Sequence, residues 1–511
     1  MAEVYFRRVM PTKITVKKKN HAMMLVDSEP SVLNELTDFF TFYVPGYKFM
    51  PAYKNKVWDG KIRLYNSQTR ELYAGLFAYV REFANAEGRD YELELEHDAY
   101  YGYVDEKIDP NMNFVNALTL TDNKGESIKP RDYQLRAVEY ALTNKRGMLI
   151  SPTASGKSLI IYMLLQWYLM NNTKKALIIV PTTSLVEQMY SDVAAYGKED
   201  DIFNIDDYHR IYSGMPKKSE MPRVIISTWQ SIYKLPGKWF EQFGCVFGDE
   251  AHNFKAKSLT SILTKMRDAE YRFGTTGTLD GTQTHKLVLE GLFGPAYYVT
   301  TTKDLMDKKQ LAQLDIKVLL LKYKDEYCRE VVKYKYQDEI DWIVRYENRN
   351  NFIANLALDQ DGNTLVLFQY VEKHGKPLYD LILKKAHKRR KIFYVSGETD
   401  TDTREHVRKI TEEQKNAIIV ASLGTFSTGV NIRNLHNIVF ASPSKSQIKV
   451  LQSIGRGLRK SDDGKDTTLY DIADDLHWKS AKNYTLQHAA ERIKIYSKER
   501  FKFNIIEIPL P

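Results

Sequence analysis

The sequence predicts an α/β protein in which two parallel-sheet domains follow one another, preceded by a small α+β amino-terminal domain. Two series of short apolar strands, each alternating with helical patterns, indicate the two sheets. The length of 511 residues allows about three domains, each large enough to bury a core. We place the domains at residues 1–105, 106–300 and 301–511.

The amino-terminal domain mixes short strands with a helix and carries many basic residues. Residues 13–19 and 22–27 are strand-like, and residues 31–43 form a helical pattern with Ser31 as a plausible N-cap. Residues 1–63 hold eleven Lys or Arg against six acids. Aromatic and basic residues interleave over 42–66, which suits phosphate contact combined with base stacking. A small domain with an aromatic core and solvated lysines would give the same pattern. The basic residues assigned to nucleic-acid binding are Lys54, Lys56, Lys61 and Arg63.

The second domain is predicted from the first strand–helix series. Its strands are expected at residues 147–151, 175–181, 222–228 and 243–250. Helical patterns over 158–172 and 183–197 separate them, as βαβ units require.

The third domain repeats this alternation. Its strands are expected at residues 363–370, 391–397, 416–422, 436–442 and 467–474. The two halves should join somewhere in 296–318. The tail, residues 481–508, is predicted to be mainly a basic amphipathic helix, which would form the carboxyl end of the third domain.

Composition narrows the class of protein. The net charge of +9 fits a polyanionic partner without proving one. No apolar run approaches the roughly 18 residues that span a bilayer, and the first ten residues lack the apolar segment of a signal peptide. Two cysteines, Cys245 and Cys328, are too few for a disulfide framework or a zinc site. These features predict a reducing, cytoplasmic location.

Residues 151–158, with the sequence SPTASGKS, have the composition and position of a phosphate-binding loop between a strand and a helix. Backbone N–H groups at Thr153, Ser155 and Gly156 would cradle phosphate oxygens. Lys157 could reach the β- and γ-phosphates, and the Ser158 hydroxyl could ligate Mg²⁺. Ser151 stands where the consensus loop has its first glycine, and an incidental Gly-Lys-Ser turn is the alternative.

A second strand, residues 243–248, ends in two adjacent acids, Asp249 and Glu250. Taken alone, such a pair would be a strand ending in solvent. Together with the loop it matches what a nucleoside triphosphatase needs. Asp249 suits a magnesium ligand, and Glu250 suits activation of the attacking water.

The sequence DEAH, residues 249–252, after SPTASGKS resembles motifs II and I of superfamily 2 helicases. This resemblance implies two tandem RecA-like domains that bind ATP and Mg²⁺ between them. It implies adenine recognition by Arg131 and Gln134, and nucleic-acid contacts from Thr182, Thr228, Trp229 and Gln230. His252, Thr276 and Thr278 would couple hydrolysis to nucleic-acid contact. Trp229 could equally be a core residue.

The second half carries segments that resemble the later motifs of the same superfamily, in the same order. Ser396, Gly397, Arg404 and Thr425 would contact the nucleic-acid backbone. Gly429 falls in the motif V segment and is assigned to the nucleotide. The string QSIGRGLRK resembles motif VI, in which Gln452 would couple the two sites. Arg456 and Arg459, three apart on one helix face, would be arginine fingers.

The segment GYKFMPAYKNKVWDGKIRLYN, residues 46–66, resembles the amino-terminal domain of phage UvsW-type helicases, and further matches extend this resemblance over nearly the full chain. It implies an ATP-driven enzyme that acts on forks, Holliday junctions and RNA–DNA hybrids in phage recombination, repair and replication. Other phage recombination proteins would be its protein partners, in the cytoplasm of the host. Thr276, Thr278 and Gln452 replace residues usual in RNA helicases and favour DNA.

Two other functions stay open at this point. The chain could be a translocase that moves on duplex DNA without separating strands. It could also be a non-catalytic nucleic-acid-binding protein, although Lys157, Glu250 and Arg459 argue against a decayed motor.

Overall fold

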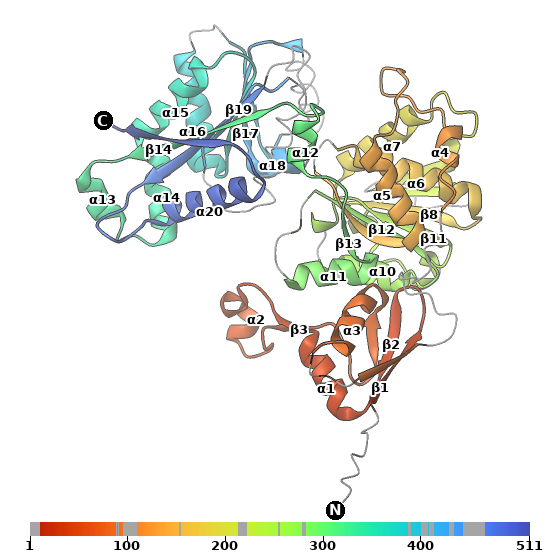
Figure 1. Cartoon of the computed structure of the whole chain (residues 1–511). Helices are drawn as coiled ribbons and strands as arrows, with labels where there is room; N and C mark the ends of the chain where they lie inside the picture. The colour runs from red at the N-terminus through yellow and green to blue at the C-terminus, as the bar shows by residue number, and fades with distance from the viewer. Residues whose placement is uncertain are drawn as a thin grey trace, which may run out of the picture. The chain divides into compact units, whose positions relative to one another are not determined.

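The computed structural model describes residues 11–87, 89, 91–95, 110–152, 155–212, 222–253, 256–277, 279, 283–386, 390–399, 407, 413–428, 434–442 and 466–511. The chain divides into two compact units (Figure 1), one formed by residues 1–299 apart from 152–155 and the other containing residues 300–511. A four-stranded sheet and two seven-stranded sheets confirm the predicted fold class. The proposed domain limits at 105 and 300 stay a prediction. No helix in the described part of the chain has both the length and the apolar character needed to cross a membrane.

The amino-terminal part of the first unit is a four-stranded sheet in the order β5-β2-β1-β6. The strands are β1 (Thr12–Lys18), β2 (Met23–Asp27), β5 (Glu71–Tyr73) and β6 (Tyr91–Leu95). Helices α1 (Pro30–Phe39) and α3 (Phe77–Ala84) contribute buried Leu36, Val80 and Phe83 to its core. The predicted cap was wrong, because α1 begins at Pro30 with Glu29 in the N-cap position and the Ser31 hydroxyl donates to Glu29 Oε1 at 3.0 Å.

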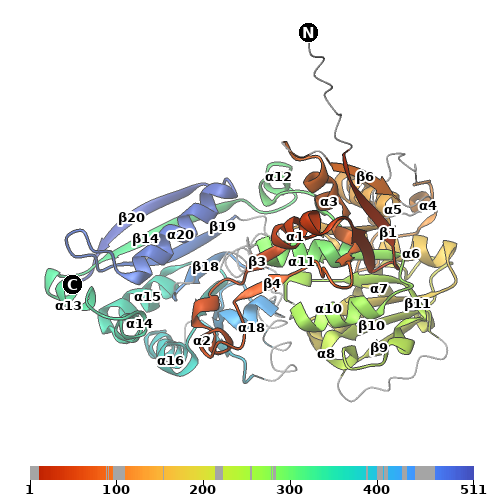
Figure 2. The same cartoon turned by 90° about the horizontal axis from the view of Figure 1, so that it is seen from below.

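Residues 41–63, which we name the tip, form a separate hairpin within this region. The tip comprises β3 (Thr41–Tyr43), η1 (Tyr47–Phe49), α2 (Pro51–Lys54) and β4 (Lys61–Arg63), with β3 and β4 antiparallel. It stands out from the four-stranded sheet in both views (Figures 1 and 2).

The amino-terminal sheet and the first parallel sheet share one hydrophobic core. Where these two parts meet, helix α11 (Gln283–Phe293) contacts η2 (Ala74–Leu76). The Tyr79 hydroxyl donates to Glu290 Oε2 at 2.6 Å, and Glu290 is only 4% exposed. At Gly75 an added Cβ would lie 2.0 Å from the Glu290 carbonyl oxygen, so the close approach requires glycine. The two parts of the unit are therefore one packed body.

The first parallel sheet has the order β13-β7-β12-β11-β8-β10-β9. Its strands are β7 (Arg146–Ile150), β8 (Lys175–Val180), β9 (Tyr208–Ile211), β10 (Val224–Thr228), β11 (Phe243–Gly248), β12 (Tyr271–Thr276) and β13 (Ala296–Tyr298). The other elements are α4 (Phe114–Ala117), α5 (Asp132–Asn144), α6 (Lys157–Asn171), α7 (Thr183–Tyr196), η3 (Ile205–Asp207), α8 (Trp229–Ile232), α9 (Gly237–Phe240), η4 (Ala251–Asn253) and α10 (Ala256–Lys265). Strands β7, β10, β11 and β12 are buried at every position, as expected of a parallel sheet covered on both faces.

The second unit holds a parallel sheet in the order β16-β17-β15-β18-β19-β14-β20. Its strands are β14 (Leu314–Lys322), β15 (Thr364–Phe368), β16 (Ile392–Val395), β17 (Ile418–Ser422), β18 (Asn437–Phe440), β19 (Thr467–Asp475) and β20 (Phe503–Pro509). The helices are α12 (Thr302–Asp307), α13 (Asp325–Val331), α14 (Tyr336–Arg345), α15 (Glu347–Asp359), η5 (Val371–Gly375), α16 (Lys376–Lys385), α18 (Leu423–Thr428) and α20 (Tyr484–Lys498).

The carboxyl-terminal tail differs from its prediction. Helix α20 is present, but residues 503–509 form β20, which pairs in parallel with β14. The buried Glu339 of α14 accepts hydrogen bonds from the Tyr484 N–H at 2.9 Å and the Thr485 N–H at 2.8 Å. A carboxylate at this position satisfies N–H groups that the first turn of α20 cannot pair internally. The tail is therefore an integral part of the sheet rather than an appended helix.

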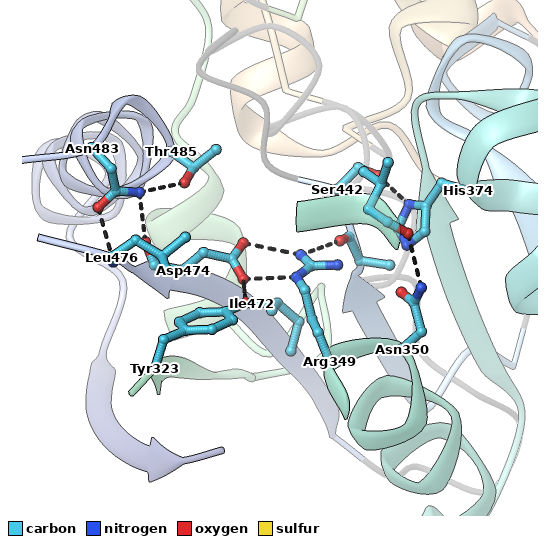
Figure 3. Close-up of polar contacts among 12 residues, drawn as sticks. Tyr323, Arg349, Asn350, His374, Ser442, Ile472, Asp474, Leu476, Asn483 and Thr485 are labelled. Atoms are coloured by element: carbon cyan, nitrogen blue, oxygen red, sulfur yellow. Dashed lines mark hydrogen bonds and ion pairs between the residues drawn. The ribbon is translucent and has the colours of Figure 1, made fainter. Parts of the chain in front are cut away.

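Two buried ion pairs tie helices to β19 (Figure 3 shows the first). Arg349 of α15 donates to both carboxylate oxygens of Asp474, at 2.7 and 3.0 Å, and to the Ala441 carbonyl at 2.8 Å. Arg492 of α20 donates to Asp471 at 2.9 Å. Residues 471 and 474 are an odd number of positions apart, so their side chains point to opposite faces of the strand. One ion pair therefore fixes a helix on each face of the sheet.

Candidate nucleotide and nucleic-acid sites

The predicted nucleotide residues gather at one edge of the first parallel sheet. The loop at 151–158 follows β7, Asp249 and Glu250 follow β11, and Thr276 ends β12. These three strands are neighbours in the order β7-β12-β11. Because carboxyl ends of parallel strands lie at the same edge, three segments far apart in sequence meet there.

Gly156 has the conformation that a phosphate-binding turn needs. Its φ of +80° lies in the left-handed region, and it forms the N-cap position of the long, largely buried helix α6. An added Cβ would lie 2.3 Å from Gln134 Nε2. Gln134 is 4% exposed, and its Oε1 accepts from the Arg131 N–H at 2.8 Å. The structure thus brings Arg131 and Gln134 against the start of α6, where helix N–H groups favour anions.

Lys157 and Glu250 form an ion pair at this edge. The Lys157 ammonium lies 3.1 Å from Glu250 Oε1 and 3.4 Å from the Ser151 carbonyl oxygen. Glu250 itself has a φ of +48°, which is uncommon for a residue with a side chain. This strained turn after β11 directs the carboxylate toward the loop, and strain of this kind is frequent at functional sites.

Asp249 is buried beside Glu250 and is held by two hydrogen bonds. Its Oδ1 accepts from the Thr275 hydroxyl at 2.6 Å and from the Glu250 N–H at 2.9 Å. Burial raises the pKa of the Asp249 carboxyl, and the Glu250 charge raises it further. A divalent cation would offset both effects, so these oxygen donors fit Mg²⁺.

Ser158, the other predicted magnesium ligand, shares a hydrogen bond with the Tyr196 hydroxyl at 2.9 Å. Across the described ranges, no group of three or more His, Cys, Asp or Glu could hold a metal ion. A magnesium ion in such a site would take its remaining ligands from water and from substrate phosphates, which is usual for Mg²⁺ in nucleotide enzymes.

His252 and Thr276, two of the predicted coupling residues, are in direct contact. The His252 Nδ1 and the Thr276 hydroxyl lie 2.5 Å apart, and the same nitrogen lies 3.4 Å from Glu250 Oε2. Both side chains are buried. A short polar path therefore runs from the Glu250 carboxylate to the end of β12.

The nucleic-acid candidates of the first unit lie at the ends of β8 and β10, which are adjacent strands. Thr182 caps α7 by accepting from the Leu185 N–H at 3.4 Å, and Thr228 is hydrogen-bonded to Ser231 at 2.9 Å. Gln230 Nε2 donates to the Pro181 carbonyl at 3.1 Å, which ties the two segments together. Trp229 is half-buried and packs against the core, which fits its alternative role as a core residue.

The basic residues assigned to the amino-terminal domain all lie in the tip. Lys54 is the last residue of α2, and Lys61 and Arg63 are the first and last residues of β4. Lys56, between α2 and β4, has a left-handed backbone conformation with a φ of +57°. Arg63 forms an exposed ion pair with Asp59 at 2.5 Å. With Lys48, the tip therefore holds five cations.

In the second unit, Ser396 and Gly397 follow β16 and Thr425 lies in α18 after β17, on neighbouring strands. A Cβ added at Gly397 would lie 3.9 Å from the Thr425 hydroxyl oxygen, so the two segments are in contact. Seven predicted site residues lie outside the described residues, and their roles stay predictions: Thr153, Thr278, Arg404, Gly429, Gln452, Arg456 and Arg459.

Sequence reasoning missed two side chains that position the site. Thr275 lies within the TTGT string and holds Asp249. Thr276 and Thr278 were predicted as coupling residues, but Thr275 was given no role. Side chains alternate along a strand, so the pattern could have shown that Thr275 and Thr276 point to opposite faces of β12. Tyr196, the partner of Ser158, has no local sequence signal, because it ends a helix 38 residues later.

Comparison with known families divides the chain into three segments. Residues 13–96 match the family described as DNA helicase UvsW, N-terminal. Residues 127–281 match the res subunit of type III restriction enzymes, and residues 348–461 match the helicase conserved C-terminal domain.

Individual relatives agree with this division. The chain is 36% identical to the ATP-dependent DNA helicase uvsW of Enterobacteria phage T4 over 506 residues, which cover 94% of this chain and 96% of the relative. The crystal structure of T4 UvsW matches 98% of this chain and all of its own, at 34% identity and a TM-score of 0.52. The DNA 3'-5' translocase XPB2 of Sulfurisphaera tokodaii is 23% identical over 72% of this chain and 87% of its own. The extent and identity of the phage match place the chain in the UvsW family of superfamily 2 ATP-dependent DNA helicases.

Proposed function

We propose that this protein uses ATP and Mg²⁺ to unwind or branch-migrate branched DNA and RNA–DNA hybrids in phage recombination, repair and replication. The observation that carries the proposal is the cluster of Lys157, Glu250 and Asp249 at one sheet edge in a chain of the UvsW family. Forks, Holliday junctions and RNA–DNA hybrids are the substrates we infer.

The nucleotide site works by positioning and charge. Lys157 binds the β- and γ-phosphates, which replace Glu250 as the partner of its ammonium. Gly156 and its neighbours Thr153 and Ser155 offer backbone N–H groups, while Gln134 and Arg131 orient the base. Asp249 and Ser158 would hold Mg²⁺, whose charge stabilises the developing negative charge on the transferred phosphoryl group. Glu250, released from Lys157, accepts a proton from the attacking water.

Communication with the nucleic acid would follow the polar contacts already present. The hydrogen bond between His252 and Thr276 links Glu250 to the end of β12. Thr182, Thr228 and Gln230 at neighbouring strand ends, with Ser396, Gly397 and Thr425 in the second unit, would bind the phosphate backbone. Because such contacts read the backbone, they confer little sequence specificity.

Comparing ATPase rates with different nucleic acids tests the proposed function. We expect a fork, a Holliday junction and an R-loop each to stimulate hydrolysis more than linear duplex DNA, because the inferred substrates are branched. Strand displacement on the same fork should accompany hydrolysis. Displacement of a third strand from a triplex without separation of a fork would instead identify a duplex translocase. The XPB2 relative is named a DNA 3'-5' translocase. Nucleic-acid binding without ATP hydrolysis under any of these conditions would identify a non-catalytic binding protein.

Removing the four tip cations that were assigned to nucleic-acid binding should weaken binding to branched DNA. We expect replacement of Lys54, Lys56, Lys61 and Arg63 with Ala to flatten the dependence of log K on log salt concentration by about 0.9 for each DNA phosphate that the variant no longer neutralises. Fork and junction affinity measured over a salt series gives this slope, and the melting temperature reports on folding.

A matched control removes the same charge elsewhere. Lys124, Lys198, Lys238 and Lys479 are exposed and lie outside the tip, so their replacement with Ala lowers the net charge equally. The control should keep the wild-type slope. Equal slopes for the two quadruple variants would mean that the tip is a packing element and does not bind nucleic acid.

A further inference from the structure

The tip exposes two large apolar side chains to solvent. Val57 is 81% exposed and Phe49 is 80% exposed, more than any other large hydrophobic residue in the described part of the chain. Tyr43, in β3 of the same hairpin, is 54% exposed. Such side chains contribute little to folding while exposed, and these belong to one small hairpin, residues 41–63. Exposed apolar groups concentrated in one element can mark an interaction site.

The tip is a folded structure and not a loose loop. The rings of Tyr43 and Tyr47 stack with centroids 4.7 Å apart. Tyr47 also covers Gly60, where an added Cβ would lie 2.3 Å from its ring, and the φ of Gly60 is +80°. The Trp58 indole donates to the Lys61 carbonyl at 2.8 Å. Phe49 and Val57 are therefore held outward by a defined backbone.

The base of the tip is anchored in the motor unit. Phe42 of β3 and Ile62 of β4 pack against the core that the amino-terminal sheet shares with the first parallel sheet. The contact between Tyr79 and Glu290 fixes the same region to α11. A movement of the first parallel sheet therefore carries the tip with it.

The charge around the apolar side chains indicates the kind of partner. Within residues 41–63 there is a single acid, Asp59, which is paired with Arg63. The other cations are Lys48, Lys54, Lys56 and Lys61. A partner must therefore combine negative charge with accessible apolar surface. Nucleic acid does so where the duplex ends at a branch, because the last base pair exposes its face between two phosphate backbones.

We propose that the tip is a strand-separating wedge in which Phe49 and Val57 pack on the terminal base pair at a branch point while the surrounding cations hold the two backbones. This inference rests on the proposed helicase function and names the residues that contact bases. It differs from the salt-slope prediction, because Phe49 and Val57 carry no charge.

A fork with 2-aminopurine at the first paired position of the branch tests the wedge. The wild-type protein at saturating concentration should raise 2-aminopurine fluorescence before ATP is added, because unstacked 2-aminopurine is brighter. The double variant Phe49→Ser/Val57→Ser should lose most of this rise. With ATP, the number of base pairs separated per ATP hydrolysed should fall about tenfold, within the range expected for loss of base stacking. Phe49→Trp should retain both signals, since tryptophan also stacks.

The control variant is Ile202→Ser, which removes an exposed apolar residue (56% exposed) outside the tip and should behave as wild type. Equal fluorescence and equal strand separation per ATP for the double variant and the wild type would overturn the wedge. Failure of the wild-type protein itself to separate the fork would instead refute the proposed function. Retention of both signals with loss of binding to a protein partner would assign the tip to protein docking and also overturn the wedge.

Discussion

We expect Glu250→Gln to lower kcat for ATP hydrolysis by about 10²–10⁴-fold, the range typical for loss of a general base. The amide has nearly the shape of the carboxylate but cannot accept a proton from water. ATP binding should persist, because Lys157 and Gly156 are unchanged and Lys157 is relieved of its ion pair with Glu250. Steady-state hydrolysis with a DNA fork gives kcat, and equilibrium binding of a fluorescent ATP analogue gives affinity.

Lys157→Ala should produce the complementary pattern. It removes the ammonium that lies at the loop, so ATP binding and hydrolysis are both lost, whereas Glu250→Gln loses hydrolysis alone. The matched control for Glu250→Gln is Glu241→Gln, since Glu241 is exposed and precedes β11 in the same unit. Near-normal turnover by Glu250→Gln would show that Glu250 does not activate water and that its ion pair with Lys157 is only structural.

The parallel sheets, and the placement of the candidate nucleotide residues at one sheet edge, could be predicted because their signals are local. Each buried strand is a short apolar run, and the residues that follow β7, β11 and β12 lie at one edge for any parallel arrangement of those strands. The motif strings therefore predict that Lys157, Asp249 and Glu250 lie close together. Their distances and the left-handed turn at Glu250 depend on packing and were not predictable.

Features that depend on distant contacts escaped prediction. Strand β20 is partly exposed, and its pairing with β14 is set by register between segments far apart in the chain. In the sequence, the helix that carries Glu290 has only the pattern of a buried helix face. That pattern does not reveal that the helix packs against the amino-terminal sheet. Arg390 lies in a basic run of the sequence, KKAHKRRK at residues 384–391. In the structure it donates to the carbonyls of Gln360 and Gly362 at 2.7 Å each. Charge in a sequence does not distinguish a solvated cation from one that is hydrogen-bonded to backbone carbonyls.

The second large effect concerns stability of the second unit and its buried pair of Arg349 and Asp474. Both side chains are 0% exposed, and the Tyr323 hydroxyl also donates to Asp474 at 2.7 Å (Figure 3). Burial alone would lower the pKa of Arg349, but the Asp474 carboxylate outweighs it, so the pKa is raised and the guanidinium stays charged. Asp474→Ala therefore leaves a buried, unpaired positive charge. We expect it to lower the free energy of unfolding by about 3–5 kcal/mol.

Two further variants compare the loss of the buried ion pair with the loss of a single hydrogen bond and with the loss of an exposed ion pair. Tyr323→Phe removes one hydrogen bond and should cost about 1 kcal/mol. Glu372→Gln breaks the exposed pair of Glu372 with Lys376, and should cost less than about 1 kcal/mol because water screens both charges. Urea unfolding measured on all three variants gives the comparison.

The double variant Arg349→Met/Asp474→Leu supplies the decisive contrast, because it removes both charges and fills the space with apolar atoms. If the buried unpaired charge is the cause, the double variant is more stable than Asp474→Ala. A double variant no more stable than Asp474→Ala would mean that the hydrogen bonds linking α15, β18 and β19, and not charge neutralisation, hold these elements together.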